Sequence, residues 1–90
     1  MEKFDKDAAR KEIQKLIHDV LNRKKVKVDL EDIKEGVSLT TQLGIDSLDI
    51  LQVAATVEKK YKIKIPEEEL KKLDDVGAIL RAVEKYWPAQ

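Results

Sequence analysis

The spacing of apolar residues along the chain predicts a series of amphipathic helices. Over residues 6–23, apolar side chains recur at helical spacing on one face, and charged side chains occupy the other face. Either Asp5 or Asp7 can serve as the N-cap of this helix. Its apolar stripe consists of Ala9, Ile13, Leu16, Ile17, Val20 and Leu21.

Residues 24–46 lack this periodicity and are expected to form a long loop. Val26, Lys27 and Val28 alternate as in a strand, but the run is too short and has no partner strand. We expect a short helical turn near 39–43. Isolated apolar residues should pin the loop to the core: Val28, Leu30, Ile33, Val37, Leu39 and Leu43.

A second helix is expected at about 47–61. Asp46 or Ser47 caps it, and Asp49 lies in its first turn, where the helix dipole stabilises a carboxylate. Its core face consists of Ile50, Val53, Ala54, Val57 and Tyr61.

Two more helices complete the expected fold. Pro66 suits the start of a short third helix at about 66–72. The fourth helix, at about 75–86, is capped by Asp74 or Asp75 and ended by Pro88. The expected fold is therefore all-α, a single domain over residues 1–90. It is a small four-helix bundle of three longer helices and one short helix, with a long loop between the first two.

Composition excludes several classes of protein. The chain has 90 residues, of which 40% are charged, and it has no cysteine, so disulfides and thiolate metal sites are excluded. The N-terminal segment does not resemble a signal peptide, and no apolar run approaches the roughly 18 residues that span a bilayer. A soluble cytoplasmic protein without membrane insertion is expected.

The net charge of zero conceals an asymmetry. Residues 1–27 hold nine basic residues against five acids, residues 28–58 hold one lysine against seven acids, and residues 59–66 add four lysines. The acidic stretch would repel phosphate, which argues against a nucleic acid partner. The asymmetry fits either a solvated surface or a partner site.

Residues for enzyme chemistry are scarce. The only histidine, His18, lies opposite the apolar stripe of its helix and is expected to face water. No cluster suggests zinc, no Gly-rich phosphate loop is present, and a catalytic triad would need His18. We expect no catalytic residues and no metal ligands.

The second helix carries apolar residues on the side away from its core face. Leu48, Leu51 and Ala55 lie there, with Gln52 and Lys59 beside them. Two interpretations remain open: the helix is wedged between its neighbours, or the strip is a contact surface next to Ser47. Ser47 itself is either a cap residue or a modified residue, since a helix N-terminus favours a phosphate ester.

The segment "LGIDSLDILQVAATVEKKYKIKIPEEELKKLDDVGAIL" (residues 43–80) resembles the acyl carrier protein family. The Gly-Ile-Asp-Ser-Leu-Asp core, the aromatic Tyr61, the Ile-Pro-Glu of the third helix and a late valine occur in the family's order. The resemblance runs from about Leu39 to Val83.

The resemblance implies that Ser47 carries 4′-phosphopantetheine, which a phosphopantetheinyl transferase moves from coenzyme A. Acyl groups would be held on it as thioesters and presented to acyl-transferring and acyl-modifying enzymes of fatty acid, lipid or polyketide biosynthesis. An acyl chain could also enter the helix bundle, and a monomer is expected. The expected partner-binding residues are Asp46, Leu48, Asp49, Leu51, Gln52, Ala55 and Lys59.

The sequence also departs from the family pattern. Gln52, Lys59 and Lys60 stand where carboxylates are common, Ala55 stands where a larger apolar residue is common, and the family is typically strongly acidic. A dedicated carrier for a specialised polyketide, aminoacyl or peptidyl pathway is therefore one alternative. A helical interaction module without a cofactor is another.

Overall fold

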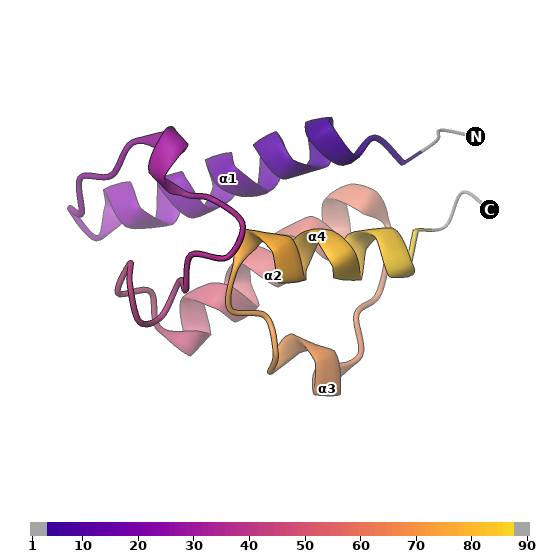
Figure 1. Ribbon diagram of the computed structural model, residues 1–90. Helices are drawn as coiled ribbons and strands as arrows, with labels where there is room; N and C mark the ends of the chain where they lie inside the picture. The colour runs from indigo at the N-terminus through magenta and orange to yellow at the C-terminus, as the bar shows by residue number, and fades with distance from the viewer. Residues whose placement is uncertain (1–3, 88–90) are drawn as a thin grey trace.

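The computed structural model describes residues 4–87 as a helical bundle with no strand in that range (Figure 1). The elements are α1 (Lys6–Arg23), the short 3-10 helix η1 (Leu30–Asp32), α2 (Ser47–Tyr61), α3 (Glu67–Leu70) and α4 (Val76–Lys85). The predicted all-α fold is confirmed. The predicted role of Pro88 lies outside the described residues.

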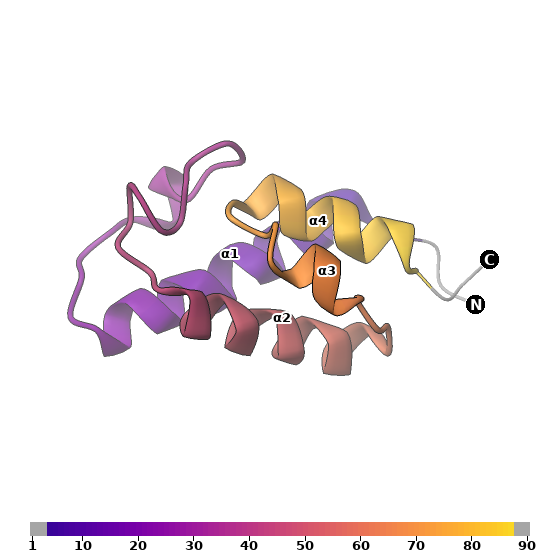
Figure 2. The same ribbon diagram turned by 90° about the horizontal axis from the view of Figure 1, so that it is seen from below.

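The three longer helices enclose the core, and α1 packs against both α4 and α2. Figure 2 shows α3 in front of the space between α2 and α4. The start of α1 and the end of α4 lie at the same end of the molecule (Figure 1). At this end the Trp87 ring lies 5.2 Å from both Phe4 and Tyr61, so three of the chain's few aromatic residues form one cluster.

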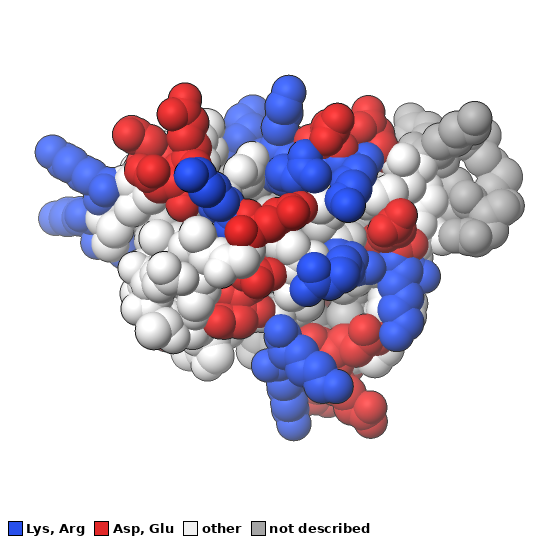
Figure 3. Space-filling model, viewed as in Figure 1, with Lys and Arg blue, Asp and Glu red and all other residues white. Residues whose placement is uncertain are grey.

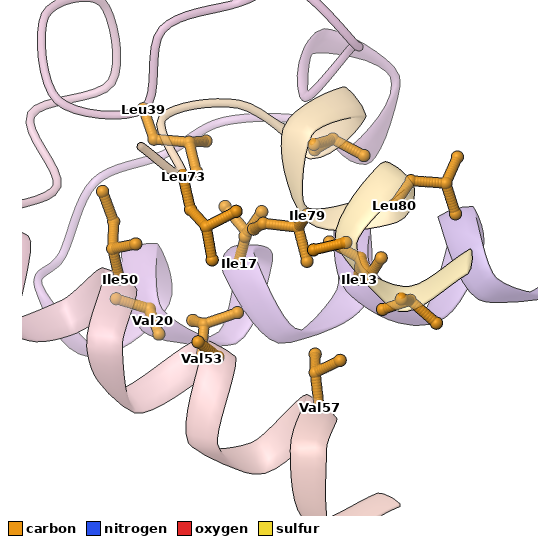
Figure 4. Packing of buried hydrophobic residues seen from close by; sticks show 14 of the residues in the cluster. Ile13, Ile17, Val20, Leu39, Ile50, Val53, Val57, Leu73, Ile79 and Leu80 are labelled. Atoms are coloured by element: carbon orange, nitrogen blue, oxygen red, sulfur yellow. The ribbon is translucent and has the colours of Figure 1, made fainter. Parts of the chain in front are cut away.

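Aliphatic side chains fill the core, and no polar or charged side chain of residues 4–87 is buried with them. Figure 4 shows side chains from α1, α2 and α4 pointing toward one another, with Leu39 and Leu73 among them. Burial of each large aliphatic side chain stabilises the fold by roughly 1.5–3 kcal/mol. All predicted stripe residues of α1 are buried except Leu16, which is half-buried.

Side-chain hydrogen bonds decide which of the candidate residues cap the helices. Asp5 caps α1, since its carboxylate accepts the Ala8 N–H at 3.1 Å, while Asp7 pairs with Arg10 at 2.7 Å. Asp75 caps α4 by accepting the Ala78 N–H at 2.6 Å.

The α-helical part of α3 is shorter than the predicted 66–72. Pro66 precedes Glu67 at the N-cap position. After Leu70 the chain tightens, because Lys72 and Leu73 donate to the carbonyls three residues back at 3.0 and 3.3 Å.

The long loop is attached to the bundle at several points. Ile33 and Leu39 are buried as predicted, and Val28, Val37 and Leu43 are half-buried. The prediction for Leu30 was wrong: it lies in η1 and is 41% exposed. Near 39–43 the chain makes a single turn, in which Gln42 N–H donates to the Ser38 carbonyl at 3.0 Å.

Polar contacts hold the loop against α1. Gln14 donates its side-chain amide to the Ile33 carbonyl at 2.6 Å, and the Arg10 guanidinium lies 3.2 Å from the Glu35 carboxylate. The loop is therefore fixed where it passes over α1 and again where it leads into α2.

Candidate functional site

Ser47 is the first residue of α2, and its side chain is exposed. The preceding Asp46 caps the helix by accepting the Asp49 N–H at 3.3 Å, and the Asp49 carboxylate accepts the Asp46 N–H at 3.4 Å. This reciprocal capping box leaves Ser47 out of the cap. Its hydroxyl makes no hydrogen bond within residues 4–87.

The turn before α2 explains why Ser47 faces outward. Gly44 has φ 72°, in the left-handed region that glycine adopts without strain. The next residue, Ile45, is 2% exposed, and its N–H donates to the Leu39 carbonyl at 2.9 Å. With Ile45 anchored in the core, the chain turns outward at Asp46 and starts the helix at the surface. Ile45 was missing from the predicted core residues.

Two acidic residues beside Ser47 share one cation from the end of α1. Lys24 Nζ lies 2.7 Å from Asp49 Oδ2 and 3.5 Å from Asp46 Oδ2. The hydrogen bond from Lys24 lowers the pKa of Asp49, and the same bond raises the pKa of Lys24. The side chain of Asp49 is only 20% exposed, whereas that of Asp46 is 65% exposed. The Asp49 carboxylate is therefore mostly occupied by contacts within the protein, namely those with Lys24 and the Asp46 N–H.

A cleft of about 450 Å³ opens beside Ser47, between α2 and the segment that contains α3. Apolar residues from both sides form one part of its lining, namely Ile50, Leu51, Leu70 and Leu73. Thr40, Lys71 and Asp74 supply the polar part. These three residues were not predicted as site residues, because only folding brings them next to Ser47.

Asp74 fixes the wall of this cleft. Its carboxylate accepts the Ser38 hydroxyl at 2.6 Å and the Thr40 hydroxyl at 2.8 Å, and its carbonyl accepts the Leu39 N–H at 2.7 Å. The hydrogen bond from Ser38, followed by that from Thr40, lowers the pKa of Asp74. Asp74, the alternative cap of α4, therefore binds the long loop instead.

The apolar strip of α2 lies at the surface. Leu48 is 74% exposed and Leu51 is 42% exposed. Gln52, Ala55 and Lys59 are exposed on the same side of the helix. The interpretation that α2 is wedged between its neighbours is therefore wrong, and the strip is available for contact beside Ser47.

Other candidate chemistry is not assembled in the described residues. His18 is half-exposed, with its Nδ1 atom 3.3 Å from the side-chain amide of Asn22. Residues 4–87 contain no group of three His, Cys, Asp or Glu side chains placed to hold a metal ion. Within the same range, no helix has the length and apolar character needed to cross a membrane.

Comparison with known proteins identifies the family. Residues 11–83 match the family model described as "Phosphopantetheine attachment site". The acyl carrier protein of Wolinella succinogenes is 39% identical over 57 residues, which cover 63% of this chain and 75% of that protein. That of Helicobacter pylori strain J99 is 32% identical over 81% of this chain and 87% of its own length. That of Thermotoga maritima is 31% identical over 87% of this chain and 95% of its own length.

The chain belongs to the acyl carrier protein family. This is a family of carriers whose prosthetic group is covalently attached 4′-phosphopantetheine. Membership of the family decides against the hypothesis of an interaction module without a cofactor.

Proposed function

We propose that Ser47 carries the 4′-phosphopantetheine group and that the chain is an acyl carrier, with residues 1–90 acting as one carrier domain. When bound, the group supplies a terminal thiol that holds acyl intermediates as thioesters. The observation that carries this assignment is the exposed Ser47 hydroxyl, which Asp46 leaves free by taking over the capping of α2.

The surroundings of Ser47 fit a phosphate ester on its hydroxyl. The N–H groups in the first turn of a helix have no partner within the helix, and together with the helix dipole they favour a negative charge there. The capping box uses the N–H of Asp49 and leaves those of Ser47 and Leu48 available. The chain's own contribution is therefore to hold the nucleophilic oxygen at the surface and to stabilise the anion attached to it.

The same site suggests how the carrier works with its partners. The phosphopantetheinyl transferase and the acyl-handling synthase enzymes would dock over Ser47 and the strip of α2, and they would supply the catalysis, so the chain itself is not an enzyme. The apolar lining of the neighbouring cleft, Ile50, Leu51, Leu70 and Leu73, can receive part of an acyl chain. We place the carrier in the cytoplasm as a monomer.

The experiment is to incubate the protein with coenzyme A, Mg²⁺ and a broad-specificity phosphopantetheinyl transferase and to measure its intact mass. Wild type should gain one phosphopantetheine group and Ser47→Ala none. Ser38→Ala is the matched control, because Ser38 is the only other serine of the sequence, and this variant should still be modified. Modification of Ser47→Ala, or none of wild type, would contradict the proposal.

The unmodified Ser47→Ala protein should remain stable. Because Asp46 supplies the cap and the Ser47 side chain is exposed, its free energy of unfolding should change by less than about 0.5 kcal/mol. Urea denaturation of both proteins measures this difference. A large loss of stability would mean that the hydroxyl has a structural role.

A carrier dedicated to a specialised pathway is a second candidate. Three residues on the outward side of α2, Gln52, Ala55 and Lys59, differ from the pattern expected of a housekeeping fatty acid carrier, and all three are exposed to a docking enzyme. The loaded protein should therefore be a poor substrate for a housekeeping ketosynthase. Turnover equal to that of a housekeeping carrier would remove this candidate.

A further inference from the structure

The charges along the outward side of α2 are arranged unevenly once internal ion pairs are taken into account. At the Ser47 end, Asp46 and Asp49 share Lys24, so three charged groups leave a single net negative charge. The fields of the paired opposite charges offset each other, and salt screens the remaining field over a Debye length of roughly 8 Å. The acidic character expected from the sequence around Ser47 is thus much reduced in the folded protein.

The other carboxylate of α2 is also engaged. Glu58 is half-buried, and its side chain accepts the Ile65 N–H at 2.7 Å in the connection to α3. It therefore points toward the chain's own backbone. Neither carboxylate of α2, Asp49 or Glu58, is freely presented on the outward side of the helix.

The other four acids of residues 28–58 lie away from α2, and one of them, Glu35, is paired with Arg10 of α1 at 3.2 Å. Asp29, Glu31 and Asp32 are exposed at η1, which packs against α1. Figure 3 shows acidic side chains gathered over the part of the surface where Figure 1 places η1. This part of the molecule is separated from α2 in both ribbon views (Figures 1 and 2).

The far end of α2 is basic. Lys60 is neutralised by Glu12 of α1 at 2.7 Å. Lys59, and Lys62 and Lys64 just after the helix, are exposed, and no ion pair joins them to a carboxylate within residues 4–87. Lys59 lies twelve residues from Ser47, which is roughly 18 Å along the helix axis.

We propose that the acyl-handling enzyme served by this carrier presents a carboxylate opposite Lys59, about 18 Å from the entrance that receives Ser47. Nearer that entrance, its docking surface has an apolar hollow for Leu48 and Leu51. Such a surface complements the strip, which is apolar with a weak negative charge at one end and is basic at the other. A carboxylate opposite Lys59 would help to orient the encounter. An enzyme with a basic residue at that position would be repelled by Lys59 and so selected against. The proposal rests on Ser47 being the attachment residue.

The test uses the holo protein, loaded with an acyl group, and a housekeeping ketosynthase that has a basic docking surface. A second form of that enzyme carries glutamate in place of the basic residue located about 18 Å from its active-site entrance. For the wild-type carrier, kcat/KM should be roughly threefold to tenfold higher with the glutamate form at low salt. Lys59→Glu should reverse this preference, and the preference of Lys59→Gln should lie between those of wild type and Lys59→Glu.

Lys34→Glu is the matched control, because Lys34 is an exposed lysine outside α2 and the change in net charge is the same. It should keep the wild-type preference. High salt should bring the ratio of kcat/KM for the two forms of the enzyme toward one for every carrier variant. Circular dichroism checks that each variant retains the helix content of wild type.

Two results would overturn the proposal. One is a wild-type carrier that prefers the basic enzyme, and the other is a Lys59→Glu variant that behaves like Lys34→Glu. Because intact mass establishes modification of Ser47 before turnover is measured, failure of the proposed function would be seen separately as a protein that gains no phosphopantetheine.

Discussion

At the scale of single residues, Asp74 joins two segments that are far apart in the sequence. It accepts hydrogen bonds from the hydroxyls of Ser38 and Thr40 at 2.6 and 2.8 Å, and so holds the loop that leads to Ser47 beside the start of α4. A carboxylate bonded to two hydroxyls restrains the loop more strongly than a neutral acceptor would. Asp74 is therefore a structural residue of the site.

Replacing Asp74 with alanine should destabilise the protein. The half-buried hydroxyl of Ser38 would lose its acceptor, at a cost of about 1–3 kcal/mol, whereas the exposed hydroxyl of Thr40 can bind water instead. Urea denaturation followed by circular dichroism measures the change in the free energy of unfolding. Glu84→Ala is the control, since Glu84 is an exposed carboxylate of α4 and should change stability by less than about 0.5 kcal/mol. Equal effects of the two substitutions would show that the Asp74 bonds contribute nothing.

The same scale shows a limit of prediction from sequence. Capping rules placed the starts of α2 and α4 but left two neighbouring candidates at each, Asp46 or Ser47 and Asp74 or Asp75. The choice depends on which side chain accepts the N–H of the residue three positions further along the chain. This in turn depends on the backbone conformation before the helix. In both places the residue that does not cap has a different environment: the Ser47 side chain is exposed at the surface, and Asp74 binds the loop.

At the scale of elements, α2 has two faces with separate roles. Its inner face packs into the core through Ile50, which is 5% exposed, while Leu48 on the outer side is 74% exposed. The helical periodicity of apolar residues predicted the inner face correctly. The outer apolar residues could not be assigned from periodicity, because a fully buried helix shows the same pattern.

Two substitutions on α2 should separate stability from docking. Ile50→Ala should lower the free energy of unfolding by about 2–5 kcal/mol, because it leaves a cavity in the core. Leu48→Ala should change the free energy of unfolding by less than about 0.5 kcal/mol. The same substitution should slow modification of Ser47 by the transferase, because it removes exposed contact surface. Thermal denaturation and the initial rate of modification measure the two effects. An unchanged modification rate for Leu48→Ala would exclude Leu48 from the transferase interface.

The loop between α1 and α2 was the least predictable element. Its apolar residues indicated attachment to the core, and Ile33 and Leu39 are buried accordingly. Isolated apolar residues without periodicity do not reveal which of them turn inward, so Leu30 was assigned to the core wrongly and Ile45 was missed. The hydrogen bonds that fix the loop link it to α1 and to Asp74, and such contacts depend on the packing of the whole chain.

At the scale of the whole molecule, carboxylates with polar partners hold neighbouring elements together. Glu12 and Lys60 join α1 to α2 at 2.7 Å, Lys24 and Asp49 join the end of α1 to the start of α2 at 2.7 Å, and Asp74 joins the loop to the start of α4. In each case the hydrogen bond to the partner, from Lys60, Lys24 and Ser38 respectively, is the largest cause that lowers the pKa of the carboxylate. Protonation of these groups would weaken the links that join α1 to α2 and the long loop to the start of α4.

Acid should therefore destabilise the fold. A carboxylate whose pKa is lower in the folded state contributes stability above its unfolded pKa and loses it as the pH falls through the folded pKa. The ordinary values are 4.5 for Glu12 and 3.8 for Asp49 and Asp74, so the free energy of unfolding should begin to fall near pH 4.5 and fall further below 3.8. Urea denaturation at a series of pH values measures this slope. Asp74→Asn should make it shallower below pH 3.8, because one of the three groups no longer titrates.

Asp19→Asn is the control, since the exposed Asp19 side chain makes no ion pair within residues 4–87, and its slope should match that of wild type. A free energy of unfolding that stays constant or rises as the pH is lowered from 4.5 would show that these carboxylates do not hold the bundle together.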